Sequence, residues 1–119
     1  MTKSYPEIAG EVVSGAARLR EALPDAMAGA GALGKAAYKD GALSGKMKEL
    51  VALAIGVASR CEGCVAWHAK MVAMKGATRE EVAEMLAVTI QMGGGPSQIY
   101  AGEALAAYDA FVAERAARG

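Results

Sequence analysis

Apolar residues recur at intervals of three and four along most of the chain, which is the spacing of one face of an α-helix. In the first segment, for example, Ile8, Val12 and Ala16 follow this spacing. The pattern predicts an all-α fold of about six helices, over residues 6–22, 26–39, 46–59, 61–75, 78–92 and 97–116.

Capping residues and helix breakers set these boundaries. Pro24 is expected to end the first helix, and Asp25 to cap the second. Ser44 is a suitable N-cap for the third helix. Thr78, followed three residues later by a glutamate, has the pattern of a capping box and opens the fifth helix. The Gly-Gly-Gly-Pro sequence at 93–96 is expected to break the chain before the sixth.

The third helix is apolar almost all round beyond its first turn, which places it in the centre of a helical bundle. Its uninterrupted apolar run, Leu50 to Ala58, is far shorter than the roughly 18 residues that a membrane helix needs. We therefore expect a buried helix here and no association with a membrane.

Composition supports the helical prediction and suggests an assembly. Alanine, the best helix former, is the commonest residue, whereas aromatic residues make up only 5% of the chain. The 119 residues are enough for a single domain over residues 1–119. Hydrophobic residues reach 54%, which is high for a domain of this size and indicates that apolar surface is buried against another subunit.

Charge and the first residues limit the partners and the compartment. Thirteen basic and thirteen acidic residues cancel, which argues against a nucleic-acid-binding protein that neutralises phosphates. The first ten residues lack the apolar core of a secretory signal, so we expect a cytoplasmic protein. In such a reducing compartment, a single pair of cysteines favours redox chemistry or metal binding over a structural disulfide.

The residues most suited to chemistry are Cys61, Cys64 and His68, which include both cysteines and the single histidine of the chain. At positions i, i+3 and i+7 of a helix they point within about 60° of one another. A cysteine in the first turn, as we expect for Cys61, is made more acidic by the helix dipole. Cys64 has the imidazole one turn away as a base, and the pair can cycle between dithiol and disulfide.

Glu49 lies on the third helix above a face of small and apolar residues, so we expect it to be partly buried against the helix that carries the cysteines. Burial raises the pKa of a carboxyl group and would make Glu49 a proton acceptor near neutral pH.

Glu49, eleven further residues and then Cys61-x-x-Cys64-x-x-x-His68 resemble the core motif of the AhpD-like alkylhydroperoxidases, in the carboxymuconolactone decarboxylase superfamily. The resemblance covers roughly residues 35–115. It implies that Cys64 attacks the substrate, that Cys61 resolves the adduct, and that Glu49 and His68 relay protons. The implied substrate is a small hydroperoxide or a disulfide, and the implied reductant is a lipoylated or peroxiredoxin-type protein. Single-domain members of this family assemble as trimers or hexamers.

The sequence departs from the family between the cysteines. Glu62 and Gly63 stand where the best-known members have serine and histidine, which puts efficient peroxidase turnover in question. The decarboxylase branch of the superfamily lacks the cysteine pair, so decarboxylation is the weaker interpretation.

Two other classes of function remain open. Glu49, Cys61, Cys64 and His68 are acceptable zinc ligands, although three of them come from one helix face. The cysteines could also pack as small hydrophobic residues in a purely structural oligomeric domain. No dinucleotide-binding or phosphate-binding fingerprint is present in the sequence, so no organic cofactor is expected.

Overall fold

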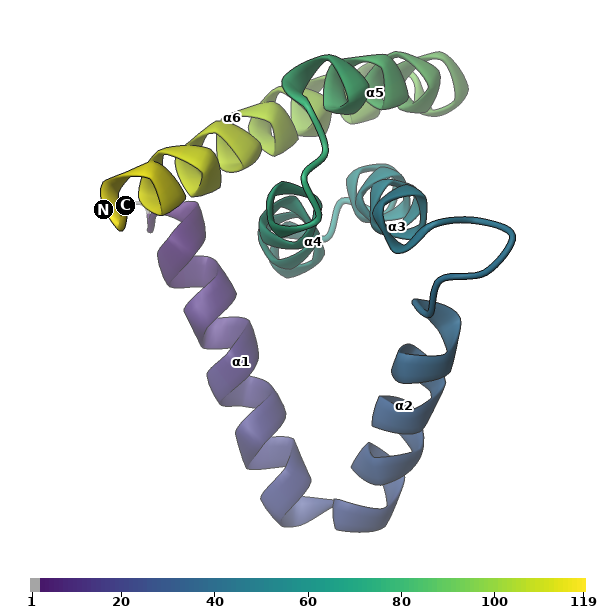
Figure 1. The fold of residues 1–119 in the computed structure, drawn as a ribbon, viewed down its shortest axis with the longest axis vertical. Coiled ribbons are helices and arrows are strands. Elements are labelled where there is room, and N and C mark those ends of the chain that lie inside the picture. The colour runs from purple at the N-terminus through teal and green to yellow at the C-terminus, as the bar shows by residue number, and fades with distance from the viewer. Residues whose placement is uncertain (1–2) are drawn as a thin grey trace.

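A computed structural model describes residues 3–119, which fold into six α-helices without a strand, as the sequence predicts (Figure 1). The helices α1 to α6 span Tyr5–Ala22, Pro24–Ala37, Gly45–Ala58, Glu62–Met74, Arg79–Gly93 and Gly95–Ala117.

Helices α3 to α6 form the packed body of the molecule, and α4 lies at its centre, in contact with α3, α6 and α1 (Figure 1). Small residues dominate this core. Helices α4 and α6 pack against each other, and each contributes a row of buried alanines, Ala66, Ala69 and Ala73 on α4 and Ala101, Ala104 and Ala107 on α6. Because alanine is small, the helix axes can approach closely, which fixes the central helix between its neighbours.

Helices α1 and α2 leave this body as the two sides of a wedge (Figure 1). The first turns of α1 are anchored, since Ala9 is buried and the Tyr5 hydroxyl donates to Glu103 Oε1 at 2.8 Å. Helix α2, all of which the structure describes, has no buried side chain. A Gly- and Ala-rich helix of this length has little stability of its own in water, so α2 depends on contacts at its ends or outside this chain.

Several predicted boundaries are corrected. Pro24 is the first residue of α2, and Leu23 rather than Asp25 is its N-cap, because the chain turns between α1 and α2 within one residue. Helix α5 continues through Gly93, and the break before α6 is the single residue Gly94 at φ +77°. Pro96 lies in the first turn of α6, where its missing N–H costs nothing.

The capping predictions for α3 and α5 are confirmed. Ser44 Oγ accepts from the amide of Met47, and Thr78 and Glu81 form a complete capping box. None of the helices within residues 3–119 combines the length and apolarity that a bilayer crossing demands.

Helix α3, expected at the centre of the bundle, packs against the body with one side only, and α4 lies at the centre instead. The side of α3 that faces the body is buried and carries Glu49, Leu53 and Gly56. Met47, Val51 and Ile55, on the opposite side, are exposed, so the expectation of a helix buried all round is wrong for the single chain.

Candidate functional site

The approach of α3 to α4 is set by a glycine. A Cβ atom placed on Gly56 would lie only 3.1 Å from the Cβ of Cys64, closer than carbon atoms normally approach. Any larger residue at position 56 would therefore push the cysteine-bearing helix away. The same face of α3 carries Glu49 two turns earlier, which directs its carboxylate toward α4.

The turn from α3 into α4 ends directly at the first cysteine. The amide of Cys61 donates to the carbonyl of Gly56 at 3.1 Å, and the amide of Arg60 donates to Val57 at 3.1 Å. These two bonds form a Schellman motif, in which the residue at the position of Arg60 must adopt a left-handed conformation. Arg60 has φ +55°, a conformation that glycine usually supplies. A strained residue thus directs the chain back onto α3 immediately before the cysteine pair.

Cys61 and Cys64 form a disulfide, with their Cα atoms 5.2 Å apart. Cys61 is the N-cap of α4, one position earlier than the first turn in which the sequence placed it, because the Schellman turn includes it. Its Sγ accepts a hydrogen bond from the backbone amide of Cys64 at 3.2 Å. The sulfur therefore occupies the place where a serine or aspartate oxygen normally caps a helix. An amide donor in this position favours negative charge on Cys61.

Glu49, which is buried, and His68, which is partly buried, form a hydrogen-bonded pair. Glu49 Oε1 lies 2.7 Å from His68 Nδ1, and the two side chains are 5% and 18% exposed. In the tautomer that carries hydrogen on Nδ1, the carboxylate accepts this hydrogen bond, which fixes the orientation of the ring and leaves Nε2 without a hydrogen. His68 lies one turn after Cys64 on α4. The structure thus places all four predicted site residues where α3 meets the first two turns of α4.

Tyr38 is a member of this cluster that the sequence did not reveal. It caps the C-terminus of α2, and its ring stacks on the imidazole of His68, with 5.9 Å between ring centroids and 28° between ring planes. Burial and the charge of Glu49 raise the pKa of Tyr38 above its ordinary value. A tyrosine that follows a helix matches no sequence motif. Its contact with His68 is evident only from the structure, in which the end of α2 lies close to α3 and α4.

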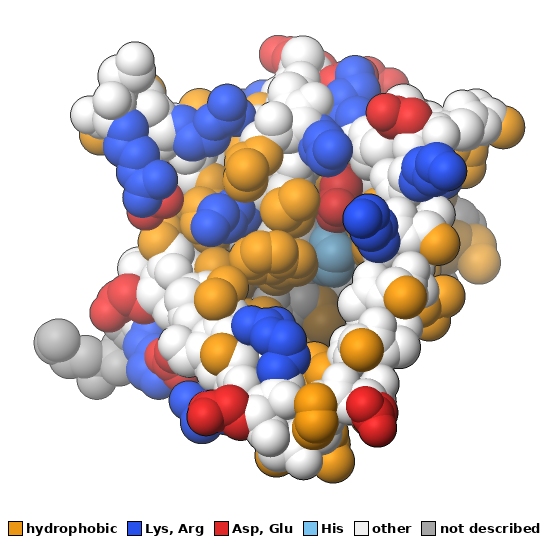
Figure 2. Space-filling view, turned by 60° about the horizontal axis from the view of Figure 1, so that its bottom comes forward, with side chains coloured by type: hydrophobic (Ala, Val, Ile, Leu, Met, Phe, Trp, Pro, Cys, Tyr) orange, Lys and Arg blue, Asp and Glu red, His pale blue; other side chains and the backbone are white. Residues whose placement is uncertain are grey.

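The cluster lies in a hollow of the surface. Figure 2 shows the single histidine recessed in this hollow, with hydrophobic side chains beside it and Lys and Arg side chains set around the mouth. Gly63, between the cysteines, allows α1 to cover one edge, because a Cβ there would lie 3.1 Å from Val12 Cγ2. The glycine that replaces the family's histidine thus has a packing role. Among residues 3–119, no three His, Cys, Asp or Glu side chains are arranged to hold a metal ion.

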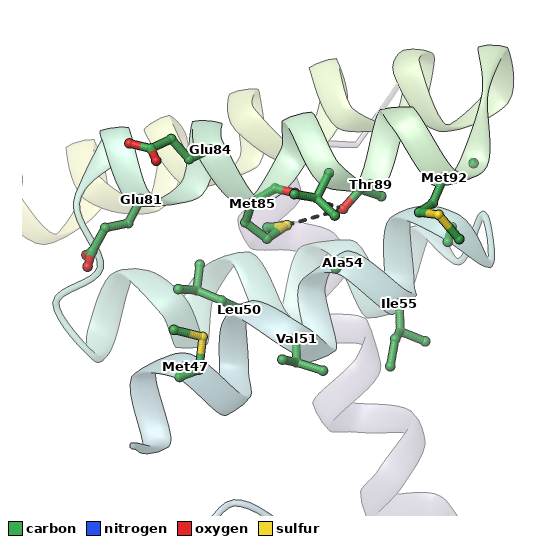
Figure 3. Close-up of a pocket in the computed structure, with 13 residues that line it drawn as sticks. Met47, Leu50, Val51, Ala54, Ile55, Glu81, Glu84, Met85, Thr89 and Met92 are labelled. Carbon is green, nitrogen blue, oxygen red and sulfur yellow. Dashed lines mark hydrogen bonds between the residues drawn. The ribbon is translucent and has the colours of Figure 1, made fainter. Parts of the chain in front are cut away.

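A second feature, the α3–α5 groove, lies on the other side of α3 (Figure 3). Its volume is about 710 Å³, and Glu81 and Glu84 lie at one end. Its walls are mainly apolar, with Met47, Leu50, Val51, Ala54 and Ile55 on α3 and Met85, Val88 and Met92 on α5. None of the four predicted site residues lines it.

Comparison with known proteins agrees with this geometry. Residues 24–117 match the carboxymuconolactone decarboxylase family. A crystal structure of an apo carboxymuconolactone decarboxylase family protein from Legionella pneumophila superimposes with a TM-score of 0.88 and 42% sequence identity, covering 91% of this chain and 96% of that one. An uncharacterized protein of Cupriavidus necator is 45% identical over 93 residues, which is 78% of this chain and 82% of the relative.

A second uncharacterized relative comes from Paracoccus denitrificans. An uncharacterized protein of the cox locus of Paracoccus denitrificans is 36% identical over 78 residues, which is 66% of this chain and 70% of the relative. The family match over residues 24–117 includes the helices that carry the cysteine pair, the Glu49–His68 pair and the contact of Gly56 with Cys64. The chain belongs to the carboxymuconolactone decarboxylase family, as its AhpD-like motif indicates.

Proposed function

We propose that the protein is a thiol–disulfide oxidoreductase of the AhpD-like type, which reduces a small organic hydroperoxide or a disulfide through the Cys61–Cys64 pair. The observation that carries this proposal is the partly buried Glu49–His68 hydrogen bond of 2.7 Å, whose histidine lies one helical turn from Cys64. A carboxylate that orients an imidazole beside a thiol is the arrangement that activates cysteine nucleophiles. The disulfide between the two cysteines corresponds to the oxidised state of such a cycle.

The proposed reaction begins from the dithiol. His68 Nε2 accepts the proton of the Cys64 thiol, and the thiolate attacks the terminal oxygen of the hydroperoxide. The O–O bond breaks, Cys64 becomes a sulfenic acid, and the leaving alkoxide takes the proton from His68. The sulfur of Cys61 then attacks Cys64, the S–O bond breaks, and water leaves with the proton of Cys61. Two thiols and one hydroperoxide thus give a disulfide, an alcohol and water.

The cycle closes when an external dithiol reduces the disulfide by two exchange steps. We propose a lipoylated or peroxiredoxin-type protein of the cytoplasm as this donor, in line with the AhpD-like motif. The attacking role goes to Cys64 because His68 follows it by one turn, whereas Cys61 receives only the backbone amide of Cys64.

The test is a thiol titration of reduced, metal-analysed protein before and after one equivalent of an organic hydroperoxide. The wild type is expected to lose both thiols together. Cys61→Ser should accumulate a sulfenic acid at Cys64, and Cys64→Ser should not react. If both thiols stay unreactive and zinc co-purifies, the protein is a metal-binding domain. If they stay unreactive without zinc, it is a structural one.

We also propose that the protein is a homo-oligomer, a trimer or a hexamer, that covers the α3–α5 groove with another copy. An exposed apolar surface of this kind can mark a site of contact between proteins. Met47, Val51 and Ile55 on α3 and Val88 and Met92 on α5 are all exposed in the single chain. The hydrophobic content of 54% agrees with a chain that completes its burial between subunits.

A further inference from the structure

A second groove lies between α1 and α4, on the side of the cysteine pair. Its volume is about 360 Å³, and its lining residues are Val12, Val13, Ala16 and Arg20 on α1 and Trp67 on α4. At 100° per residue, the four α1 residues lie within about 100° of one another and form one face of the helix. The groove is thus an apolar trough with an aromatic wall and one cation, which is the composition of a small-molecule site.

One end of the groove lies beside the backbone between the two cysteines. Val12 lines it and also closely approaches Gly63, the residue between the two cysteines. Trp67 follows Cys64 by one turn and directly precedes His68. A molecule that lies along the trough therefore has one end next to Gly63, between the two cysteines.

The other end of the groove is cationic. Arg20 lies eight residues after Val12 on α1, which corresponds to a distance of about 12 Å along the helix axis. Lys70 Nζ lies 5.5 Å from the centroid of the Trp67 ring, so a second cation borders the same aromatic wall. Figure 2 shows Lys and Arg side chains around the mouth of the neighbouring hollow. The charge of Glu62 raises the pKa values of Lys3 and Tyr5, which lie near the start of α1.

We propose that the α1–α4 groove binds the organic part of the substrate and selects hydroperoxides whose apolar chain ends in a carboxylate. The chain lies against Val12, Ala16 and Trp67, and the carboxylate is paired with Arg20. The spacing along α1 fits a medium-length chain, roughly ten carbons for the 12 Å between Val12 and Arg20. This inference rests on the proposed peroxide reduction for its catalytic consequence but not for the binding itself.

Binding can be measured without any reaction, because the single tryptophan of the chain lines the groove. Decanoate is titrated into the full-length Cys61→Ser/Cys64→Ser variant, and the fluorescence of Trp67 is followed. Decanoate should give a saturable change, and decanol, which has no charge, should bind about tenfold more weakly, the difference that one charge-assisted hydrogen bond makes. Absence of a saturable change, or equal affinities for the two compounds, overturns the proposal.

Arg20→Gln and Arg18→Gln form a matched pair, since residue 18 lies about 160° from residue 20 around the helix and is not in the groove. Arg20→Gln should weaken decanoate binding about tenfold and leave decanol binding unchanged. Arg18→Gln should change neither. If the two variants weaken decanoate binding equally, only the general positive charge is responsible and the proposal fails.

The catalytic consequence is tested on the wild-type cysteines with two hydroperoxides of equal length, one carrying a carboxylate and one neutral. Arg20→Gln should lower the rate of thiol oxidation by the carboxylated compound about tenfold and leave the rate with the neutral compound unchanged. If decanoate binds as expected but neither hydroperoxide oxidises the thiols, the subsite stands and the proposed function fails. If both compounds react equally fast with wild type and variant, the function stands and the selectivity fails.

Discussion

The ring of Tyr38 lies over the ring of His68, with their centroids 5.9 Å apart. The imidazole is thus held from two directions, at its edge by the carboxylate of Glu49 and at its face by the tyrosine. Tyr38 belongs to the C-terminus of α2, whereas the two other residues belong to α3 and α4. Helix α2, which has the fewest contacts with the body, therefore supplies the ring that covers His68, the proposed base.

Removal of the Tyr38 ring should slow the reaction of the reduced protein with a hydroperoxide. Tyr38→Ala leaves one face of the imidazole open to water and frees its rotation, and we expect a loss of about tenfold, as for a mispositioned catalytic group. Tyr38→Phe keeps the stacked ring and should stay within about twofold of the wild type. Stopped-flow measurement of thiol oxidation distinguishes them, and an equal loss in both variants would show that the hydroxyl, not the ring, matters.

Tyr38 should ionise at a higher pH than an ordinary tyrosine. Burial and the negative charge of Glu49 both raise its pKa, so the ultraviolet difference titration of wild type against Tyr38→Phe should have its midpoint above about 10. Because the folded state holds this proton more tightly, the stabilisation is present below pH 10 and is lost as the pH rises through the folded pKa.

The Glu49→Gln variant tests whether the charge of Glu49 contributes to the raised pKa of Tyr38. It removes the charge but not the burial, so the Tyr38 midpoint should move down and still remain above about 10. A Tyr38 midpoint that is the same in the wild type and in Glu49→Gln would contradict the electrostatic interaction between the two groups.

The same Glu49→Gln variant should be a poor catalyst with an intact fold. Glutamine keeps the shape of the side chain but cannot stabilise the imidazolium that forms when His68 takes the thiol proton. We expect the oxidation of the thiols to slow by about 10²-fold, at the lower end of general acid–base effects. Rapid-quench thiol counting, with circular dichroism as a control for folding, measures this loss. A variant with wild-type rate would remove Glu49 from the relay.

Gly56 and Gly102 should respond in opposite ways to alanine. A Cβ at Gly56 meets Cys64 at 3.1 Å, whereas a Cβ at Gly102, on α6, has no described atom within 4 Å. Gly102→Ala should stabilise the protein by about 0.5–1 kcal/mol through helix propensity. Gly56→Ala should be destabilised relative to it by about 1–3 kcal/mol, the usual range for overpacking. Urea unfolding of both variants gives the difference. Equal free energies of unfolding would mean that α4 can shift away from residue 56 without a cost in stability.

Ile55 and Ile99 provide a matched pair for the assembly. Both are exposed isoleucines, 60% and 69%, but only Ile55 lines the α3–α5 groove. A charge buried at a subunit contact without a partner is strongly unfavourable, so Ile55→Glu should dissociate the assembly. Ile99→Glu should leave it intact. Light scattering at matched concentration gives the mass of each species, and a monomeric wild type would end the proposal of an oligomer.

Local signals in the sequence predicted most of the fold. Capping residues act within one turn, so Ser44 and Thr78 marked their helices correctly. The first helix ends at Ala22, before Pro24, as predicted, but Pro24 and Pro96 also lie in the first turns of the helices that follow, a second role that suits the residue. The exposed side of α3 was missed, since an apolar pattern does not tell a core contact from a contact with another subunit.

For the candidate site, the sequence predicted the residues on one helix face and their proximity to Glu49. It could not predict Tyr38 or the packing role of Gly63, because both depend on how the α1–α2 pair returns to the body. Contacts between segments far apart in sequence leave no periodic pattern. The displacement of Cys61 from the first turn to the N-cap was also hidden, since it depends on the left-handed Arg60.

Cys61 serves two purposes with one atom, since its sulfur is both half of the disulfide and the acceptor that starts α4. An oxygen in the same place, as in serine, would begin the helix equally well. A lineage could therefore lose the cysteine pair by exchanging sulfur for oxygen and keep its backbone unchanged. Among proteins of this shape, the identity of the residue at position 61 is more informative about chemistry than any degree of structural likeness.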